Sequence, residues 1–214
     1  MKDRPTDTKL QTRRLRLRNT IYSRLSSRYV DEKERDSKMV KHFYDRGEDV
    51  PLWAIFELMY LSDLASFSEC LNKNIREKIL GELNMLDVTI DTNAKLLSTT
   101  LYTIKNLRNA VAHNGIVFDV RFKDRVIAKT LRPWLEQETR IQNITLSSII
   151  DYIIIICCLL KRLDFDHKRA TGLLDSFIDA TNKLKNQVNS NVYPMIVRPN
   201  EYAKLTALRA YLNS

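Results

Sequence analysis

Residues that break helices are scarce throughout this chain. Only four of its 214 residues are glycine and five are proline. A strand-and-turn architecture needs many such residues at its turns, whereas long helices need few. With 44% of its residues apolar, the chain also has enough hydrophobic side chains for a core. These features predict an all-α fold, a helical bundle whose connections are mostly short.

Apolar residues recur at helical spacing over most of the chain. Residues 31–50 are one exception, and residues 116–144 are expected to be irregular with short helical pieces, one of which Pro133 breaks. Ser148 and Asp151 are three residues apart, a spacing compatible with a capping box at a helix start. Helices are expected over residues 8–30, 52–72, 75–83, 92–113, 146–163, 168–190 and 199–213.

Positive charge is concentrated at the start of the chain. The net charge is +9, and residues 1–30 hold nine lysine or arginine residues against two aspartates. A concentrated basic segment predicts binding to a polyanion, most simply RNA, although a run of charge is also common on a solvated helix face. The candidate RNA-binding residues of the first helix are Arg13, Arg14, Arg16, Arg18 and Arg24.

The three cysteines show no spacing typical of a metal site or of a disulfide framework. We therefore expect a reducing, cytoplasmic setting, with no metal and no cofactor. The charged N-terminus does not resemble a secretion signal. The run Ile149–Leu160 is shorter than a membrane span and contains Asp151, so it is expected to be a buried core helix and not a membrane segment.

A compact set of polar groups lies at the end of the helix expected over residues 92–113. The stretch RNAVAH supplies Arg108, Asn109 and His113, and Lys105 lies one turn earlier. Asn109 and His113 are four residues apart and share a helix face, whereas Arg108 lies about 140° around the helix axis from His113. A two-fold homodimer would bring two copies of this helix end together and pool their side chains.

These residue types suit cleavage of RNA without a metal ion. The ribose 2′-hydroxyl is the nucleophile, so an enzyme has to move protons and stabilise charge on the phosphorane. His113 is the candidate acid or base, Arg108 can bind the non-bridging oxygens through two N–H groups, and Asn109 can orient either group. Lys105 and Arg121 are further candidates for holding RNA. The products would be a 2′,3′-cyclic phosphate and a 5′-hydroxyl.

The surroundings of this motif resemble a known family. The segment LRNAVAHNGIVFDVRF (residues 107–122) resembles the signature helix of HEPN-superfamily ribonucleases, in which an arginine is followed four to six residues later by a histidine. Upstream, Pro51, Trp53 and Glu57 lie in a segment similar to one in the abortive-infection AbiD/AbiF-like family. The stretch LRLRNTIYSRLSSRY (residues 15–29) resembles the helix that precedes that segment in the family.

The resemblance implies a HEPN-like α-helical bundle that acts in phage defence or in a toxin–antitoxin system. Many HEPN proteins are metal-independent endoribonucleases that work as dimers, and some AbiF-like proteins are thought to be restrained by a small non-coding RNA. Carried over to this chain, the motif implies that Arg108 and His113 are catalytic and that Asn109 supports them. Many relatives have an arginine shortly after the histidine, whereas the next arginine of this chain is Arg121.

We therefore expect a homodimeric endoribonuclease that acts on RNA and has no membrane partner. Residues 1–50 would form a basic helix and a charged connection, residues 51–165 the HEPN-like bundle, and residues 166–214 additional helices packed on it. Trp53 is expected to pack in the core or at an interface, and Glu57 to pair with an arginine. Two alternatives stay open: a non-catalytic RNA-binding module whose motif caps a helix at a dimer interface, and a DNA-binding regulator, although the sequence has no helix-turn-helix signature.

Overall fold

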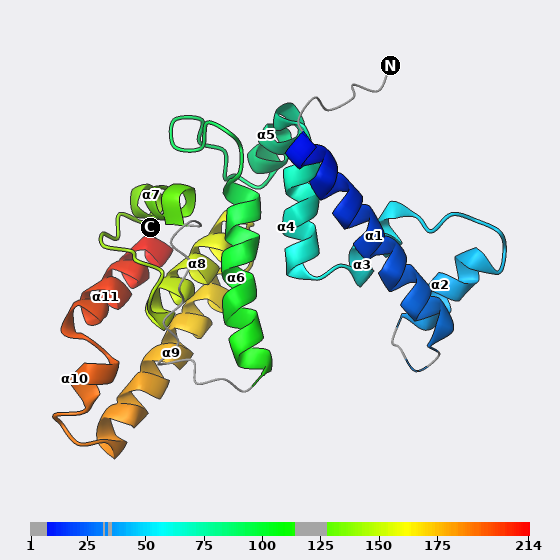
Figure 1. Cartoon of the computed structure of the whole chain (residues 1–214). Helices are drawn as coiled ribbons and strands as arrows, with labels where there is room; N and C mark the ends of the chain where they lie inside the picture. The colour runs from blue at the N-terminus through cyan, green and yellow to red at the C-terminus, as the bar shows by residue number, and fades with distance from the viewer. Residues whose placement is uncertain (1–7, 32, 34–35, 114–127) are drawn as a thin grey trace. The chain divides into compact units, whose positions relative to one another are not determined.

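The computed structural model describes residues 8–31, 33, 36–113 and 128–214. Over these residues the fold is all-α, with eleven helices and no strand, which confirms the predicted fold class (Figure 1). The helices form two compact units, residues 1–72 and residues 73–214. Contacts between helices thus group residues 51–72 with the basic first helix, and the last helices of the chain with the bundle.

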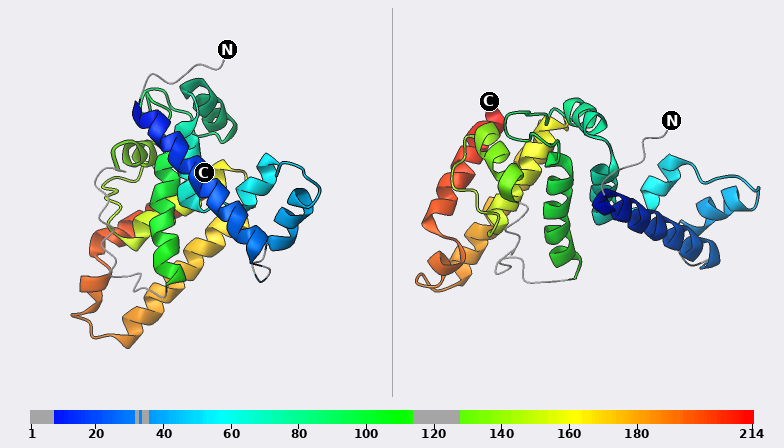
Figure 2. Two further views of the ribbon diagram at one scale, coloured as in Figure 1. Left: turned by 45° about the vertical axis from the view of Figure 1, so that its right-hand side comes forward. Right: turned by 45° about the horizontal axis from the view of Figure 1, so that its top comes forward.

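The first unit is built on the basic helix α1 (Thr8–Val30). Three shorter helices pack against it: α2 (Ser37–Tyr44), α3 (Leu52–Leu58) and α4 (Leu61–Cys70) (Figure 2). The sequence did not predict α2, because eight residues give too little periodicity to be recognised. The buried apolar side chains of this unit form two small clusters, Leu17, Met59 and Cys70 in one and Leu25, Val40 and Leu58 in the other.

The single helix expected over residues 52–72 is in fact two helices, α3 and α4. Met59 and Tyr60 both have extended backbone angles, with ψ of 139° and 163°, so α3 ends there and α4 begins anew. Asp63 stabilises the new start, because its carboxylate accepts a hydrogen bond from the backbone N–H of Tyr60 at 3.0 Å. Neither glycine nor proline lies at this break, so the sequence pattern runs through it.

The second unit is a bundle arranged around α8 (Ile149–Arg162). Helices α9 and α11 lie along α8, and α7 contacts α6, α8 and α11 (Figures 1 and 2). Ile150, Ile154 and Ile155 are fully buried, which confirms the prediction of a core helix. The other helices are α5 (Lys73–Glu82), α6 (Leu96–Ala112), α7 (Ala128–Thr139), α9 (His167–Gln187), α10 (Tyr193–Ile196) and α11 (Pro199–Asn213).

Helix α7 contradicts the expectation that Pro133 breaks a helical piece within residues 116–144. Pro133 lies inside α7. A proline within a helix removes one backbone hydrogen bond, but the neighbouring Leu131, Trp134 and Leu135 are all buried in the core of the second unit. Burial of these three side chains favours the helix by more than the proline disfavours it.

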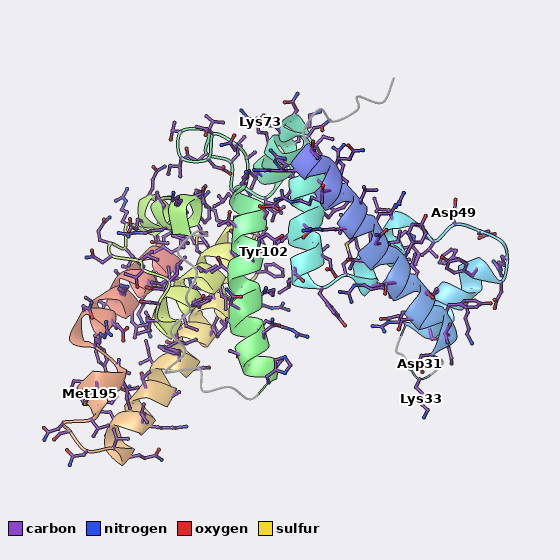
Figure 3. The ribbon with its side chains drawn as sticks, viewed as in Figure 1. Asp31, Lys33, Asp49, Lys73, Tyr102 and Met195 are labelled. Atoms are coloured by element: carbon purple, nitrogen blue, oxygen red, sulfur yellow. The ribbon has the colours of Figure 1, made fainter. Side chains whose placement is uncertain are left out.

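The one-turn helix α10 was also not predicted. Its Tyr193 is buried, whereas Met195, labelled in Figure 3, is 79% exposed. In the described part of the chain, no helix is long and apolar enough to cross a membrane.

Burial raises the pKa of the Cys157 and Cys158 thiols to about 12, so both remain protonated and unreactive at neutral pH.

A buried ion pair joins the start of α8 to α11. One carboxylate oxygen of the fully buried Asp151 accepts a hydrogen bond from Nζ of Lys204 at 2.6 Å. The other oxygen accepts from the backbone N–H groups of Thr145 and Leu146 at 3.0 and 2.9 Å. Asp151 therefore does not form the expected capping box with Ser148, whose side chain makes no capping hydrogen bond. It instead orders the chain that enters α8.

Replacing Asp151 with alanine is expected to destabilise the protein by about 3–5 kcal/mol, because Lys204 would become a buried charge without its partner. The free energy of unfolding is measured by urea denaturation followed by far-UV circular dichroism. Asp175→Ala is the matched control, since Asp175 pairs with Arg209 on the surface, where such pairs contribute at most about 1 kcal/mol. Equal losses in the two variants would contradict a structural role for the buried pair.

Candidate functional site

Helix α6 carries the RNAVAH motif and is held firmly in the second unit. Leu96, at its start, donates its backbone N–H to the carboxylate of the buried Asp91 at 2.6 Å. One face of the helix is then buried along its length, through Leu96, Thr100, Thr103 and Leu107. Leu96 and Leu107 belong to the main apolar core of the unit. The motif therefore follows directly after a buried residue of a fixed helix.

The last turn of α6 is open to solvent. Arg108, Val111 and His113 are exposed and Asn109 is half-buried. Val111, the apolar residue among them, is 57% exposed. The helix ends at Ala112, and His113 directly follows it as the C-cap residue. The sequence predicted a helix that ends at His113. The three predicted catalytic residues thus lie together at an accessible helix end.

Asn109 contacts both other residues of the motif. Nη1 of Arg108 donates a hydrogen bond to Oδ1 of Asn109 at 3.4 Å, a long and therefore weak bond. The backbone N–H of His113 donates to the carbonyl oxygen of Asn109 at 3.0 Å, so the helical turn continues up to His113. Arg108 and His113 both belong to the described residues, and no hydrogen bond joins them. This agrees with the separation around the helix that the spacing predicts.

Two other predicted RNA-binding residues belong to this region. Lys105 is half-buried on α6, one turn before Asn109. Arg121 lies outside the described residues. Of the candidates in the second unit, the structure therefore gathers Lys105, Arg108, Asn109 and His113 on α6.

Two arginines near the start of α1 contact the end of α4. Nε and Nη2 of Arg14 both donate to the carbonyl oxygen of Cys70, at 3.2 and 2.9 Å. The neighbouring Arg13 pairs with Glu69 at 2.9 Å, and its side chain remains 46% exposed. Arg14 thus satisfies a backbone group at a helix end, a structural role, whereas Arg13 keeps part of its guanidinium in solvent.

Arg24 contacts the opposite end of α4. It pairs with Asp63 at 2.6 Å, and its guanidinium carbon lies 3.6 Å from the centroid of the Tyr60 ring. Only 19% of the Arg24 side chain is exposed. We therefore assign Arg14 and Arg24 to the packing of α1 on α4 and keep Arg13, Arg16 and Arg18 as the residues that can reach a ligand.

The partners of these arginines could not be identified from the sequence. Asp63, Glu69 and the carbonyl of Cys70 lie on α4, between 39 and 56 residues further along the chain than the arginines that they contact. The relevant signal is a pair of acidic residues six apart on a helix that packs antiparallel to α1. That signal is recognisable only once the packing of the two helices is known.

Trp53 and Glu57 are both exposed on α3. The Trp53 side chain is 59% exposed and meets the Phe43 ring edge to face, with 6.2 Å between ring centroids. Trp53 is therefore not a core residue, and that part of the expectation is wrong. Whether it packs at an interface with another chain stays a prediction.

The described residues contain no group of three His, Cys, Asp or Glu side chains that could hold a metal ion. His167 follows two aspartates in the sequence, but His167 and Asp166 each have another contact. Its Nε2 lies 3.1 Å from the carbonyl oxygen of Leu212. Asp166 accepts a hydrogen bond from the backbone N–H of Lys168 at 2.9 Å and so caps α9.

Comparison with models of known protein families shows a match. The model of a family described as Abi-like protein matches residues 2–119, more than half of the chain. The matched range includes both α1 and the motif of α6. No curated protein and no solved structure matches the chain significantly.

The exposure of the helix end predicts that the motif contributes little to stability. Arg108→Ala and His113→Ala are each expected to change the free energy of unfolding by less than about 0.5 kcal/mol, as surface substitutions usually do. Leu107→Ala is the comparison, and it should cost about 2–5 kcal/mol because it empties part of the core. Urea denaturation measures all three. A large loss for His113→Ala would instead identify the histidine as a structural cap.

Proposed function

The chain belongs to the Abi-like protein family, an abortive-infection family, and from this premise we propose that it is a metal-independent endoribonuclease that acts in phage defence. The observation that carries the proposal is the solvent-exposed end of α6, where an arginine, an asparagine and a histidine lie within six consecutive positions. A helix end buried in the core would be closed to a polymer, whereas this one is open to it.

The proposed reaction needs only proton transfer and charge stabilisation. The 2′-oxygen of a ribose attacks the adjacent phosphorus as its proton passes to a base, and the bond from phosphorus to the 5′-oxygen breaks as that oxygen receives a proton from an acid. His113 serves as the base or the acid. Arg108 stabilises the charge on the non-bridging oxygens, and Asn109, which contacts Arg108, orients the guanidinium. The products are a 2′,3′-cyclic phosphate and a 5′-hydroxyl.

A second copy of the chain completes the proposed site. Arg108 and His113 lie on different faces of α6, so one helix end does not direct both at the same phosphate. Two helix ends related by two-fold symmetry would place the arginine of one beside the histidine of the other. The exposed Val111 lies between these residues in the sequence and supplies an apolar contact for such a pairing.

The proposed RNA partners include the substrate and a small non-coding RNA that would inhibit the enzyme. Nine basic residues among the first thirty favour binding to either. Lys105, one turn before Asn109 on α6, is proposed to hold RNA beside the reacting phosphate. Arg121 keeps the same role as a proposal from the sequence. The three cysteines are free and buried, which suits the reducing cytoplasm in which RNA is found.

One observation favours a second candidate function. His113 ends α6, a position at which a histidine commonly serves as a cap. The chain would then be a non-catalytic RNA-binding module, with the motif as a structural helix cap at a dimer interface. This alternative predicts RNA binding without any cleavage product.

The cleavage test uses labelled RNA, with EDTA and without it. His113→Ala is expected to lower the cleavage rate by about 10²–10⁴-fold, the usual contribution of general acid–base catalysis. Arg108→Lys should also cleave slowly, because lysine keeps the charge but not the two-pronged geometry. His42→Ala is the matched control, since His42 is an exposed histidine on α2. End-group analysis should find 2′,3′-cyclic phosphate in the products.

Three outcomes contradict the nuclease proposal. Cleavage that persists in His113→Ala, or that disappears with EDTA in the wild-type protein, would exclude this mechanism. RNA binding with no product from any tested RNA would favour the non-catalytic module.

A further inference from the structure

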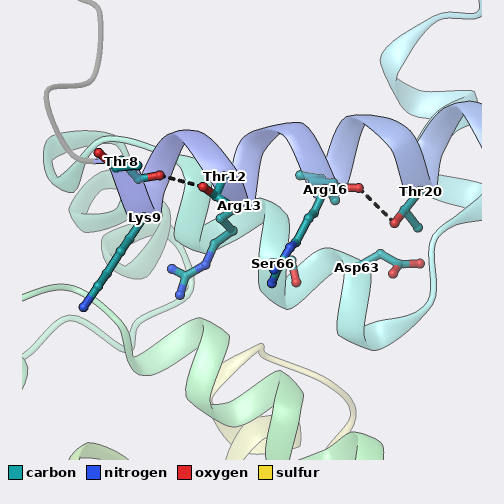
Figure 4. A pocket seen from close by; sticks show the side chains of 9 residues that line it. Thr8, Lys9, Thr12, Arg13, Arg16, Thr20, Asp63 and Ser66 are labelled. Atoms are coloured by element: carbon teal, nitrogen blue, oxygen red, sulfur yellow. Dashed lines mark hydrogen bonds between the residues drawn. The ribbon is translucent and has the colours of Figure 1, made fainter.

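The first unit contains a groove between α1 and α4, and residues of both helices line it. It has a volume of about 500 Å³, and three basic residues of α1, Lys9, Arg13 and Arg16, line it (Figure 4). From α4 it receives Asp63 and Ser66. Figure 4 shows the side chains of Lys9, Arg13 and Arg16 extending from α1 along the same side of the helix.

The groove carries an excess of positive charge. Among the described residues that line it, the single acidic one is Asp63, which is already paired with Arg24 at 2.6 Å. Arg13 shares its charge with Glu69. Arg16 is exposed, and among the described residues no acid pairs with its guanidinium. Arg16 is therefore the cation of this groove that is most available to an anionic ligand.

Two hydroxyl groups flank Arg16 at a distance of one helical turn on each side. Oγ1 of Thr12 donates its proton to the carbonyl oxygen of Thr8 at 2.8 Å, and Oγ1 of Thr20 donates to the carbonyl oxygen of Arg16 at 3.0 Å. Figure 4 draws both bonds as dashed lines. Since each hydroxyl has one proton, Thr12 and Thr20 can offer only acceptor lone pairs to a ligand in the groove.

This arrangement selects among anionic ligands. A phosphate oxygen at neutral pH accepts hydrogen bonds, so it suits Arg16 and does not suit the two threonine oxygens. A ribose 2′-hydroxyl can donate and therefore suits both threonines. Thr12, Arg16 and Thr20 follow one another at four-residue intervals, about 6 Å apart along the helix axis. The groove thus presents an acceptor, a cation and an acceptor in turn, and the two threonines, about 12 Å apart along the axis, can reach riboses that are not adjacent in an RNA strand.

We propose that the groove between α1 and α4 binds a single strand of RNA, with Arg16 on a phosphate and the Thr12 and Thr20 hydroxyls accepting hydrogen bonds from ribose 2′-hydroxyls. The proposal rests on the proposed function for the nature of the polymer, and it adds where the strand binds and how RNA is distinguished from DNA. The row from Thr12 to Thr20 is about 12 Å long. Modules that read duplex RNA contact roughly 16 base pairs, which is several times that length, so a single strand is the ligand that fits.

The test measures affinity by fluorescence anisotropy with a single-stranded RNA and with the DNA strand of the same base sequence. All proteins carry His113→Ala and the buffer contains EDTA, so that binding is separated from cleavage. Adding Arg16→Ala should lower the affinity for both ligands about five- to tenfold, and it should lower the slope of log K against log salt by about 0.7, the value for one phosphate contact on a single strand. The comparison variant is Arg18→Ala, an exposed arginine of α1 that does not line the groove, and its loss should be clearly smaller.

The second variant adds Thr12→Val and Thr20→Val, which remove both oxygens and keep the side-chain shape. It should weaken RNA binding about fivefold, the effect of one or two neutral hydrogen bonds, and should leave DNA binding unchanged. Circular dichroism checks that the helix content is retained. An equal loss for RNA and DNA, an unchanged RNA affinity, or an Arg18→Ala loss as large as that of Arg16→Ala would overturn the proposal. Because no cleavage is measured, a failure of the nuclease proposal leaves these comparisons readable.

Discussion

The second unit depends on the burial of α8. This helix is apolar on almost every side, and such a helix is stable in water only when others enclose it. Ile150, Ile154, Ile155 and Cys157 are covered by the surrounding helices. The one acidic residue within α8, Asp151, is accommodated because Lys204 and two backbone N–H groups satisfy its carboxylate. The core is thus fixed both by apolar burial and by one polar contact of defined geometry.

Enclosure of α8 also determines what is left at the surface. The buried face of α6, including Leu96 and Leu107, packs in the same core, so the last turn is the part of the helix that remains exposed to solvent. In the first unit, Arg14 and Arg24 of α1 contact residues of α4, whereas other basic residues of α1 line the groove. In both units, packing selects which polar side chains a ligand can reach.

The sequence predicted the long elements of the fold and missed what depends on tertiary contacts. Helices α1, α6 and α9 follow from apolar periodicity, which many residues report together. The break at Tyr60 and the tolerance of Pro133 in α7 could not be predicted, because each depends on partners elsewhere in the fold. The motif of α6 was found because its residues are adjacent in the sequence. The pairing of Asp151 with Lys204 joins residues 53 apart, and the available signal was misread as a local cap.

RNA cleavage by dimers of two different inactive variants tests most directly whether Arg108 and His113 act on one phosphate from two copies of the chain. Arg108→Ala and His113→Ala chains are each inactive on this account, and co-expression should produce mixed dimers in which one of the two sites has both residues. Half of the dimers are mixed by chance, so RNA cleavage should recover to about one quarter of the wild-type rate. No recovery, with mixed dimers present, would contradict a site shared between two helix ends.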